Sequence, residues 1–348
     1  MEKIKTIAIE PISGKVVSDL TLGIEDTEVE EAEVIDDEEW GDNHPNFIES
    51  NTSAITLEEL TTQNIIPTFS DNTLTLSHQN FIGAVIRAAE SVFGELTTPE
   101  LRVSHPIIGR IPSAHHKKAN ELLPEEKTVF YQRIAWCCHV KGLTRYINGQ
   151  TVHLCIGGVR AYSEDKLYNR QSPQKFKIFV GWQVRVCSNL MLTCDGNSGT
   201  IECLTEADLS SKATALFTAF NPHKEETLQL LENLQNTPLS ESQFCTIVGR
   251  LRLLQNLPVS EQKNHPSVSI GDQAVNALVK NYVQNPAFGK KEGEDYTCWN
   301  LMQNANEAVK QAYIDRWLDR NQNCTDFAIG IQKAINGEDT EGYDWFLN

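Results

Sequence analysis

Residues 174–191 constrain the fold most. They read Gln-Lys-Phe-Lys-Ile-Phe-Val-Gly-Trp-Gln-Val-Arg-Val-Cys-Ser-Asn-Leu-Met. Phe176 and Ile178 share one parity of an extended chain, while Phe179 and Gln183 take the other. Because successive side chains of a strand point to opposite faces, the stretch predicts a central strand. We therefore expect an α+β fold, in which the segments before and after this strand form layers around a largely antiparallel sheet.

The residues before this strand are rich in β-formers. Residues 131–140 place apolar side chains, among them Trp136, at every second position. Asn148-Gly149 between β-prone flanks is a strong hairpin signal, since both residues tolerate the positive φ of a tight turn. Gly157-Gly158 in the return strand indicates a bulge or a close approach of another chain segment.

Helical spacing dominates from about residue 206 and also occurs once earlier. Ser77 and Gly94 are the expected N-cap and stop of a helix over residues 77–94. Ser240 and Gln243 form a capping box that opens a helix over residues 240–256. Further helices are expected over residues 224–235, 273–282 and 297–320, the last as one long amphipathic helix.

Charge is distributed unevenly along the 348 residues, whose net charge is −17. Residues 1–86 carry eighteen Asp or Glu against three Lys, whereas residues 87–185 carry fifteen Lys or Arg against eight Asp or Glu. Eleven of the eighteen residues 25–42 are acidic, which favours disorder. We predict an acidic disordered leader (1–43), a sheet-centred domain (44–215), a helical layer packed on it (216–336) and an acidic tail (337–348).

The nine cysteines have no regular spacing and form no Cys-x-x-Cys, which is typical of a reducing cytoplasm. No apolar run approaches the roughly 18 residues of a membrane span, and the N-terminus lacks the core of a signal peptide. The sequence predicts a soluble cytoplasmic protein that does not bind membranes. A homo-oligomer is compatible with these observations.

Three patches of the chain resemble a known family. They are Arg185-Val-Cys-Ser-Asn189, Val248-Gly-Arg-Leu-Arg-Leu-Leu-Gln-Asn-Leu-Pro258 and Thr297-Cys-Trp-Asn-Leu-Met-Gln-Asn-Ala305. Over residues 45–330 their order and spacing resemble the phage/plasmid-like family of domain-of-unknown-function proteins carried on bacterial mobile elements. One departure is Leu190, where relatives often have Gly or Thr. The resemblance implies a mobile-element setting and no established activity.

Candidate catalytic and metal-binding groups are sparse. Cys137 and His139 share a strand face near His153 and Cys155, but zinc usually takes four ligands with regular spacing, so buried sheet residues are the better interpretation. Cys187 could be a nucleophile, although no histidine partner is evident. A metal-dependent nuclease would need acids such as Glu164, Asp165, Asp195 and Glu202, which form no strand-borne pair. We expect no catalytic residues, metal or cofactor.

Basic and aromatic residues alternate along the predicted strands, which is the pattern that single-strand binding needs. The first hypothesis is a non-enzymatic mobile-element accessory protein that binds nucleic acid, in particular single-stranded DNA, during recombination, replication or element maintenance. The alternative is a counter-defence protein that binds a host protein, and a metal-dependent nuclease ranks third. The expected nucleic-acid-binding residues are Arg133, Lys141, Arg145, Arg160, Lys175, Lys177, Trp182 and Arg185.

Overall fold

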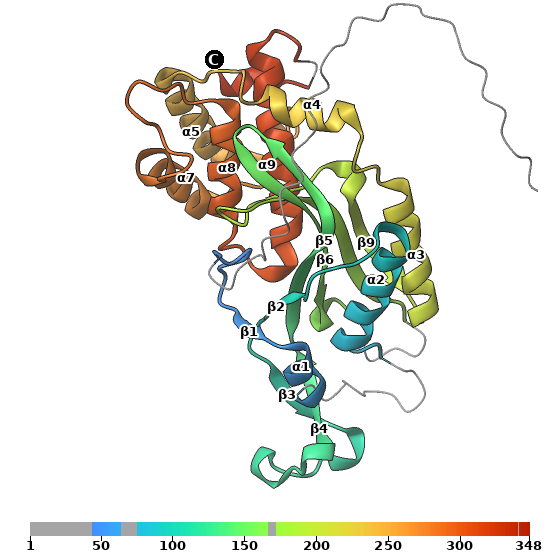
Figure 1. The fold of residues 1–348 in the computed structure, drawn as a ribbon. Helices are drawn as coiled ribbons and strands as arrows, with labels where there is room; N and C mark the ends of the chain where they lie inside the picture. The colour runs from blue at the N-terminus through green and yellow to red at the C-terminus, as the bar shows by residue number, and fades with distance from the viewer. Residues whose placement is uncertain (1–43, 64–74, 166–171, 340) are drawn as a thin grey trace, which may run out of the picture. The chain divides into compact units, whose positions relative to one another are not determined.

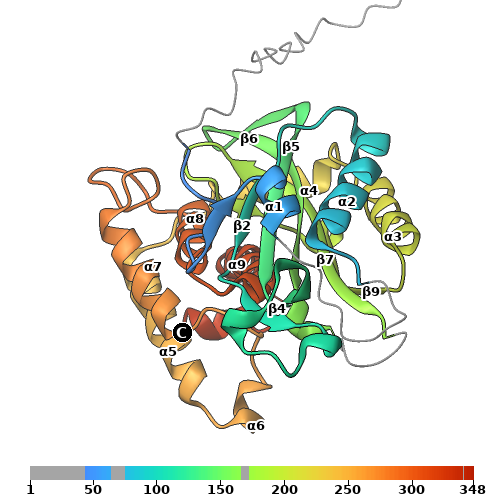
Figure 2. The same cartoon turned by 90° about the horizontal axis from the view of Figure 1, so that it is seen from below.

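A curved antiparallel sheet with helices on both faces forms the framework of the computed structural model (Figures 1 and 2). The structure describes residues 44–63, 75–165, 172–339 and 341–348. The predicted disorder of the acidic leader therefore lies outside the described residues. The strands are β1 (Ser53–Ile55), β2 (Glu100–Val103), β3 (Ile107–Arg110), β4 (Lys127–Tyr131), β5 (Arg133–Ile147), β6 (Gln150–Ala161), β7 (Gln174–Val184), β8 (Leu190–Met191) and β9 (Asn197–Cys203).

Seven strands form the main sheet, in the order β1-β2-β5-β6-β7-β8, with β9 also paired to β7. All of these pairings are antiparallel. Asn148 and Gly149 adopt φ of 51° and 74° and turn β5 into β6, so the predicted hairpin is confirmed. The α+β class with a central antiparallel sheet is confirmed as well.

The helices confirm most of the predicted boundaries. Ser77 and Ser240 are the N-caps of α2 and α5, as expected, and the predicted capping box at Ser240 is confirmed. The helices are α1 (Leu57–Gln63), α2 (His78–Phe93), α3 (Glu206–Ala219), α4 (Glu225–Asn233), α5 (Glu241–Asn256), α6 (Val259–Gln262), α7 (Asp272–Gln284), α8 (Cys298–Val309) and α9 (Ile314–Ile335).

The prediction of one long helix over residues 297–320 is wrong, because the helix is interrupted between α8, which ends at Val309, and α9, which begins at Ile314. The carbonyl of Lys310 accepts hydrogen bonds from the backbone N–H groups of Glu49 and Ser50, at 2.9 and 3.1 Å. In a continuing helix this carbonyl would accept from the N–H group four residues further on, but here Glu49 and Ser50 are its donors. Tyr313 then adopts an extended ψ of 144° and α9 starts in a new direction.

Both faces of the sheet are covered. Trp136 packs edge-on against Phe81 of α2, with ring centroids 6.0 Å apart, while Phe179 packs against Trp317 of α9 at 5.9 Å. Figures 1 and 2 show α2 and α3 on one side of the sheet and α8 and α9 on the other. The central strand β7 is therefore buried along nearly its whole length, and no broad face of it is left for a ligand.

The glycine pair in β6 is explained by this double coverage. A Cβ at Gly157 would overlap the Trp136 carbonyl and the Phe179 ring, and a Cβ at Gly158 would overlap Phe81. The predicted close approach is confirmed, on both faces at once.

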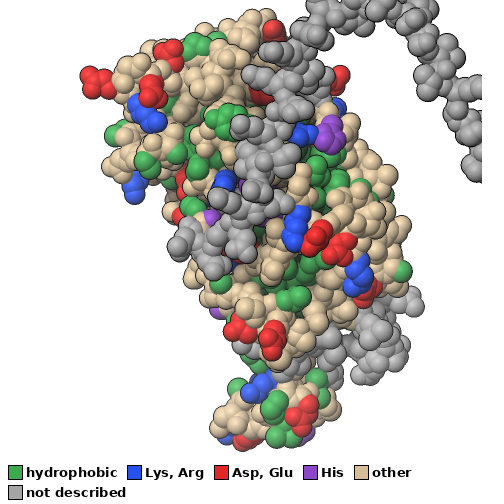
Figure 3. Space-filling model, in the orientation of Figure 1, with side chains coloured by type: hydrophobic (Ala, Val, Ile, Leu, Met, Phe, Trp, Pro, Cys, Tyr) green, Lys and Arg blue, Asp and Glu red, His purple; other side chains and the backbone are tan. Residues whose placement is uncertain are grey.

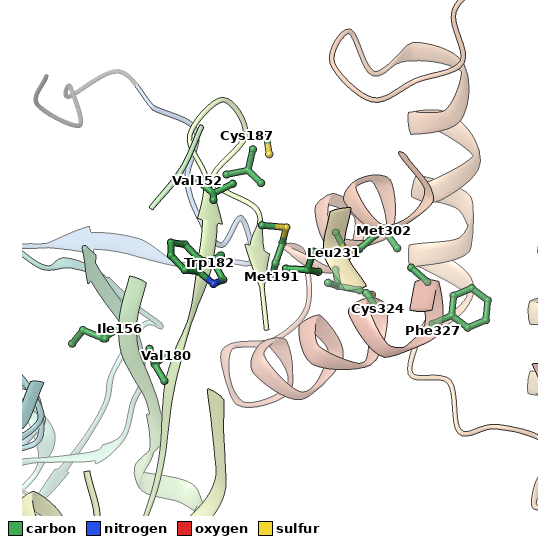
Figure 4. Packing of buried hydrophobic residues seen from close by; sticks show 14 of the residues in the cluster. Val152, Ile156, Val180, Trp182, Cys187, Met191, Leu231, Met302, Cys324 and Phe327 are labelled. Carbon is green, nitrogen blue, oxygen red and sulfur yellow. The ribbon is translucent and has the colours of Figure 1, made fainter. Parts of the chain in front are cut away.

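The helical part shares its core with one edge of the sheet. Figure 4 shows Met191 and Trp182 from the sheet in the same apolar cluster as Met302 of α8 and Phe327 of α9. At the C-terminus, Tyr343 and Phe346 are buried against this cluster, so the acidic tail contributes two core residues. The expected helical layer and the sheet are thus joined by one continuous core.

Candidate functional site

Arg160 lies inside the protein. Its side chain is fully buried, and its guanidinium donates to Asp165 Oδ2 at 3.1 Å and to Gln174 Oε1 at 2.7 Å. The rings of Tyr162 and Phe176 lie 4.7 and 4.5 Å from the guanidinium carbon. Burial raises the pKa of Asp165, an effect that the Arg160 charge opposes. Arg160 thus has a structural role inside the protein, and its buried guanidinium is not available to a ligand at the surface.

Lys177 and Trp182 are also buried. The ammonium of Lys177 donates to the Asp315 carbonyl at 3.1 Å and to Asp319 Oδ2 at 2.7 Å, both on α9. A charge reversal at Lys177 would therefore report on sheet–helix packing rather than on ligand binding.

The other predicted cations are dispersed. Lys141 Nζ pairs with Glu95 at 2.5 Å, and Arg145 contacts the His223 ring. Lys175 and Arg185 are half-buried, and neither has an ion pair among the described residues. These residues do not gather into one surface.

Arg133, like the buried Arg160, lies beside two aromatic rings, but its side chain is partly exposed. Its guanidinium carbon lies 4.9 Å from the Tyr131 ring centroid and 5.4 Å from that of Tyr313. Its Nε lies 2.8 Å from Asp315 Oδ1, so Arg133 also forms an ion pair with α9. The side chain of Arg316 is 72% exposed next to this cluster. We call Tyr131, Arg133, Tyr313 and Arg316 the Tyr313 surface.

The break between α8 and α9 creates this surface. Tyr313 is the N-cap residue of α9, where its extended backbone leaves the ring 67% exposed. The opposing half of the surface comes from the end of β4 and the start of β5. Tyr313 and Arg316 were missed from the sequence because the stretch was interpreted as continuous helix. The signal that could have found them is tertiary, namely the use of the Lys310 carbonyl by Glu49 and Ser50.

Two of the patches that carry the family resemblance meet in a buried polar joint. Asn189 Nδ2 donates to the backbone carbonyl and to Oε1 of Gln303, both at 3.0 Å. The ammonium of Lys310 donates to the Cys187 carbonyl and pairs with Glu307 Oε2 at 2.9 Å. This joint ties the turn after β7 to α8, so these motifs have a structural role.

The chemistry of this joint argues against a cysteine nucleophile. Burial raises the pKa of Cys187 to about 12, despite the nearby Lys310 charge. The thiolate is the nucleophilic form, and it would be scarce at neutral pH. Ser188 adopts a φ of 54° and its hydroxyl is buried, which is a turn conformation rather than an exposed nucleophile.

The metal candidates are not assembled either. Cys137 and Cys138 point to opposite faces of β5, and the hydrogen bond with the Cys155 thiol, together with burial, raises the pKa of Cys137. His139 Nε2 lies 2.6 Å from Gln183 Oε1, and burial lowers the pKa of this histidine to about 4. Within the described ranges, no three His, Cys, Asp or Glu side chains are placed to share a metal ion.

Two of the carboxylates proposed for a nuclease have other partners. Asp165 pairs with Arg160, and Asp195 Oδ2 lies 3.5 Å from Lys224 Nζ.

All nine cysteines are free thiols. None of the helices that the structure describes is both long and apolar enough to cross a membrane.

Comparison with known protein families gives a match over most of the chain. A family model described as "Domain of unknown function, B. Theta Gene description (DUF3871)" matches residues 28–347. No curated protein and no solved structure matches significantly. Because the model covers nearly the whole chain, this protein belongs to the DUF3871 family, whose function is unknown.

Proposed function

We propose that the protein binds single-stranded nucleic acid at the Tyr313 surface, as a non-enzymatic accessory protein of a bacterial mobile element. The observation that carries this proposal is the exposed Tyr313 ring beside two arginines, Arg133 and Arg316. The mobile-element setting is supported by the resemblance of the three sequence patches described above.

Both parts of a single-strand site are available at this surface. A base can stack on an exposed ring, which contributes about 1–3 kcal/mol per base. Arg133 is held in place by Asp315, so its ion pair leaves less net charge for phosphate than a free arginine would. Arg316 lies 4.0 Å from the same carboxylate and is far more exposed, so it is the stronger candidate for a phosphate contact.

The test is fluorescence anisotropy with labelled single-stranded DNA across a salt series. Tyr313→Ala should weaken binding on the order of tenfold, the effect of losing one stacked base. Tyr146→Ala is the matched control, because Tyr146 is also 67% exposed but lies at the β5–β6 hairpin, away from the Tyr313 surface. Equal losses in the two variants, or none in either, would contradict the proposed location.

Charge is tested in the same way. Arg316→Glu should weaken binding and reduce its salt dependence, whereas Lys280→Glu on α7 makes the same change in net charge at a distant exposed site. If both variants lose affinity equally, only the overall charge matters.

The alternative is a protein partner, such as a host factor that the protein inhibits. The exposed apolar side chains of Leu123 and Val186 favour this alternative. Absence of DNA binding at low salt, together with capture of one host protein that Leu123→Ser abolishes, would support it. Metal-dependent cleavage of the labelled DNA would instead support the third hypothesis, a nuclease.

A further inference from the structure

The segment from residue 105 to residue 131 forms a two-stranded arm. Its strands β3 and β4 pair with each other and, within the described residues, with no strand of the main sheet. Figure 1 shows the arm extending from the sheet below β2 and α1. An isolated hairpin of this kind is only marginally stable in water. We call this segment the β3–β4 arm.

The arm carries apolar side chains that are exposed to solvent. Ile107 and Ile108 are 49% and 50% exposed and are consecutive in β3, where the strand register shifts. Figure 3 shows hydrophobic and charged side chains intermixed on this part of the molecule. Because consecutive strand residues point to opposite faces, each face of this narrow ribbon carries one exposed isoleucine.

Two cations of the arm, Arg110 and Lys127, lie close enough to repel each other when no ligand is bound. Arg110 is directly opposite Lys127 in the β3–β4 register, so their side chains leave the ribbon on the same side. Like charges in this position repel each other. Arg110 donates to backbone carbonyls of His115 and Lys117, and neither cation has an ion pair among the described residues.

The acids of the arm do not offset this pair. Glu126 pairs with Lys117, and Glu121 accepts from the Lys118 backbone N–H. Glu125 is exposed at the tip. The Arg110–Lys127 pair is therefore complementary to an anionic ligand, and a ribbon two strands wide fits a groove of duplex DNA.

We infer that the β3–β4 arm binds the groove of a DNA duplex next to the strand held by the Tyr313 surface, so that the preferred ligand is a junction of duplex and single strand. The inference rests on the proposed function. Its further support is continuity: β4 ends at Tyr131, which lies opposite Ile107 in the register and also flanks Arg133. Apolar side chains inserted between base steps, with cations on the adjacent phosphates, are an established way to bind a groove.

The test compares three labelled DNAs: a single strand, a blunt duplex, and the same duplex carrying the single strand as a tail. The tailed duplex should bind about tenfold more tightly than either alone. Two extra phosphate contacts should also steepen the slope of log affinity against log salt by about 2.

Two variants locate the effect. Ile107→Ser with Ile108→Ser should abolish the gain for the tailed duplex and leave single-strand affinity unchanged, because the Tyr313 surface is intact. Leu253→Ser with Val259→Ser is the control, since it also removes two exposed apolar side chains, on α5 and α6. Arg110→Glu should reduce the salt slope only for the tailed DNA. Thermal unfolding checks that each variant is folded.

The outcomes separate the two proposals. Equal affinity for the tailed duplex and the single strand would overturn the junction inference and leave the proposed function standing. A gain that survives in the isoleucine variant, or a blunt duplex that binds as tightly as the tailed one, would also overturn it. No binding to any of the three DNAs would overturn both.

Discussion

Protonation of His139 should make the protein unstable in acid. The imidazole belongs to β5 and is buried, and its Nε2 lies 2.6 Å from Oε1 of Gln183 on β7. Burial lowers its pKa from 6.5 to about 4 in the folded state. The unfolded chain therefore binds a proton at pH values where the folded protein does not, and stability falls as the pH drops below 6.5.

The size of this effect follows from the two pKa values. One pKa unit corresponds to about 1.4 kcal/mol, so the full shift is worth about 3 kcal/mol once the pH is below 4. Between pH 7.5 and pH 5 the loss should be about 2 kcal/mol of unfolding free energy. Above pH 7 the imidazole is neutral in both states and contributes no pH dependence.

The assay is urea unfolding at several pH values between 7.5 and 5, with His139→Gln as the perturbation. The glutamine amide can still donate to Gln183, but it does not titrate. The difference in unfolding free energy between the two proteins should shift by about 2 kcal/mol in favour of the variant over this range. His105→Gln, at an exposed position, controls for the loss of a histidine. A constant difference across the pH range would refute the reasoning.

Three further perturbations test the packing around the sheet. Arg160→Met leaves Asp165 buried without its cation and should cost about 3–5 kcal/mol in urea unfolding, and a loss below 1 kcal/mol would contradict a buried ion pair. Gly158→Ala forces a Cβ into Phe81 and should cost at least about 1–3 kcal/mol, which Phe81→Ala in the same chain should partly relieve. Because burial raises the pKa of Cys187 to about 12, its alkylation at pH 8 should be slow in the native protein and fast in urea, and rapid native labelling would show that the thiol is accessible.

The parts of the fold that were predicted correctly depend on local signals. Asn148-Gly149 encodes its own turn geometry, and Ser77 and Ser240 encode the starts of their helices through side chains three residues away. The alternation in residues 174–191 likewise identified a central strand. These signals operate within a few residues, so a single sequence carries them.

The site residues could not be predicted in the same way. A lysine or arginine on a strand is equally compatible with solvent and with a buried partner. Arg160 and Lys177 are buried because they pair with Asp165 and Asp319. Asp319 is 142 residues from Lys177 in the sequence, so no local pattern reveals this pair. Likewise, no local signal ends α8 at Val309, because the groups that take up the Lys310 carbonyl come from residues 49 and 50.

The family resemblance therefore concerns the framework that presents the Tyr313 surface rather than the surface itself. Asn189 donates a hydrogen bond to Gln303 on α8, and the Cys187 carbonyl accepts one from Lys310 at the end of α8. The turn after β7 thus determines both which face of α8 packs against the sheet and where α8 ends. The position of that end determines where Tyr313 emerges beside Arg133. The motifs act here through packing, and Tyr313, where we propose that a base stacks, lies three residues beyond Lys310.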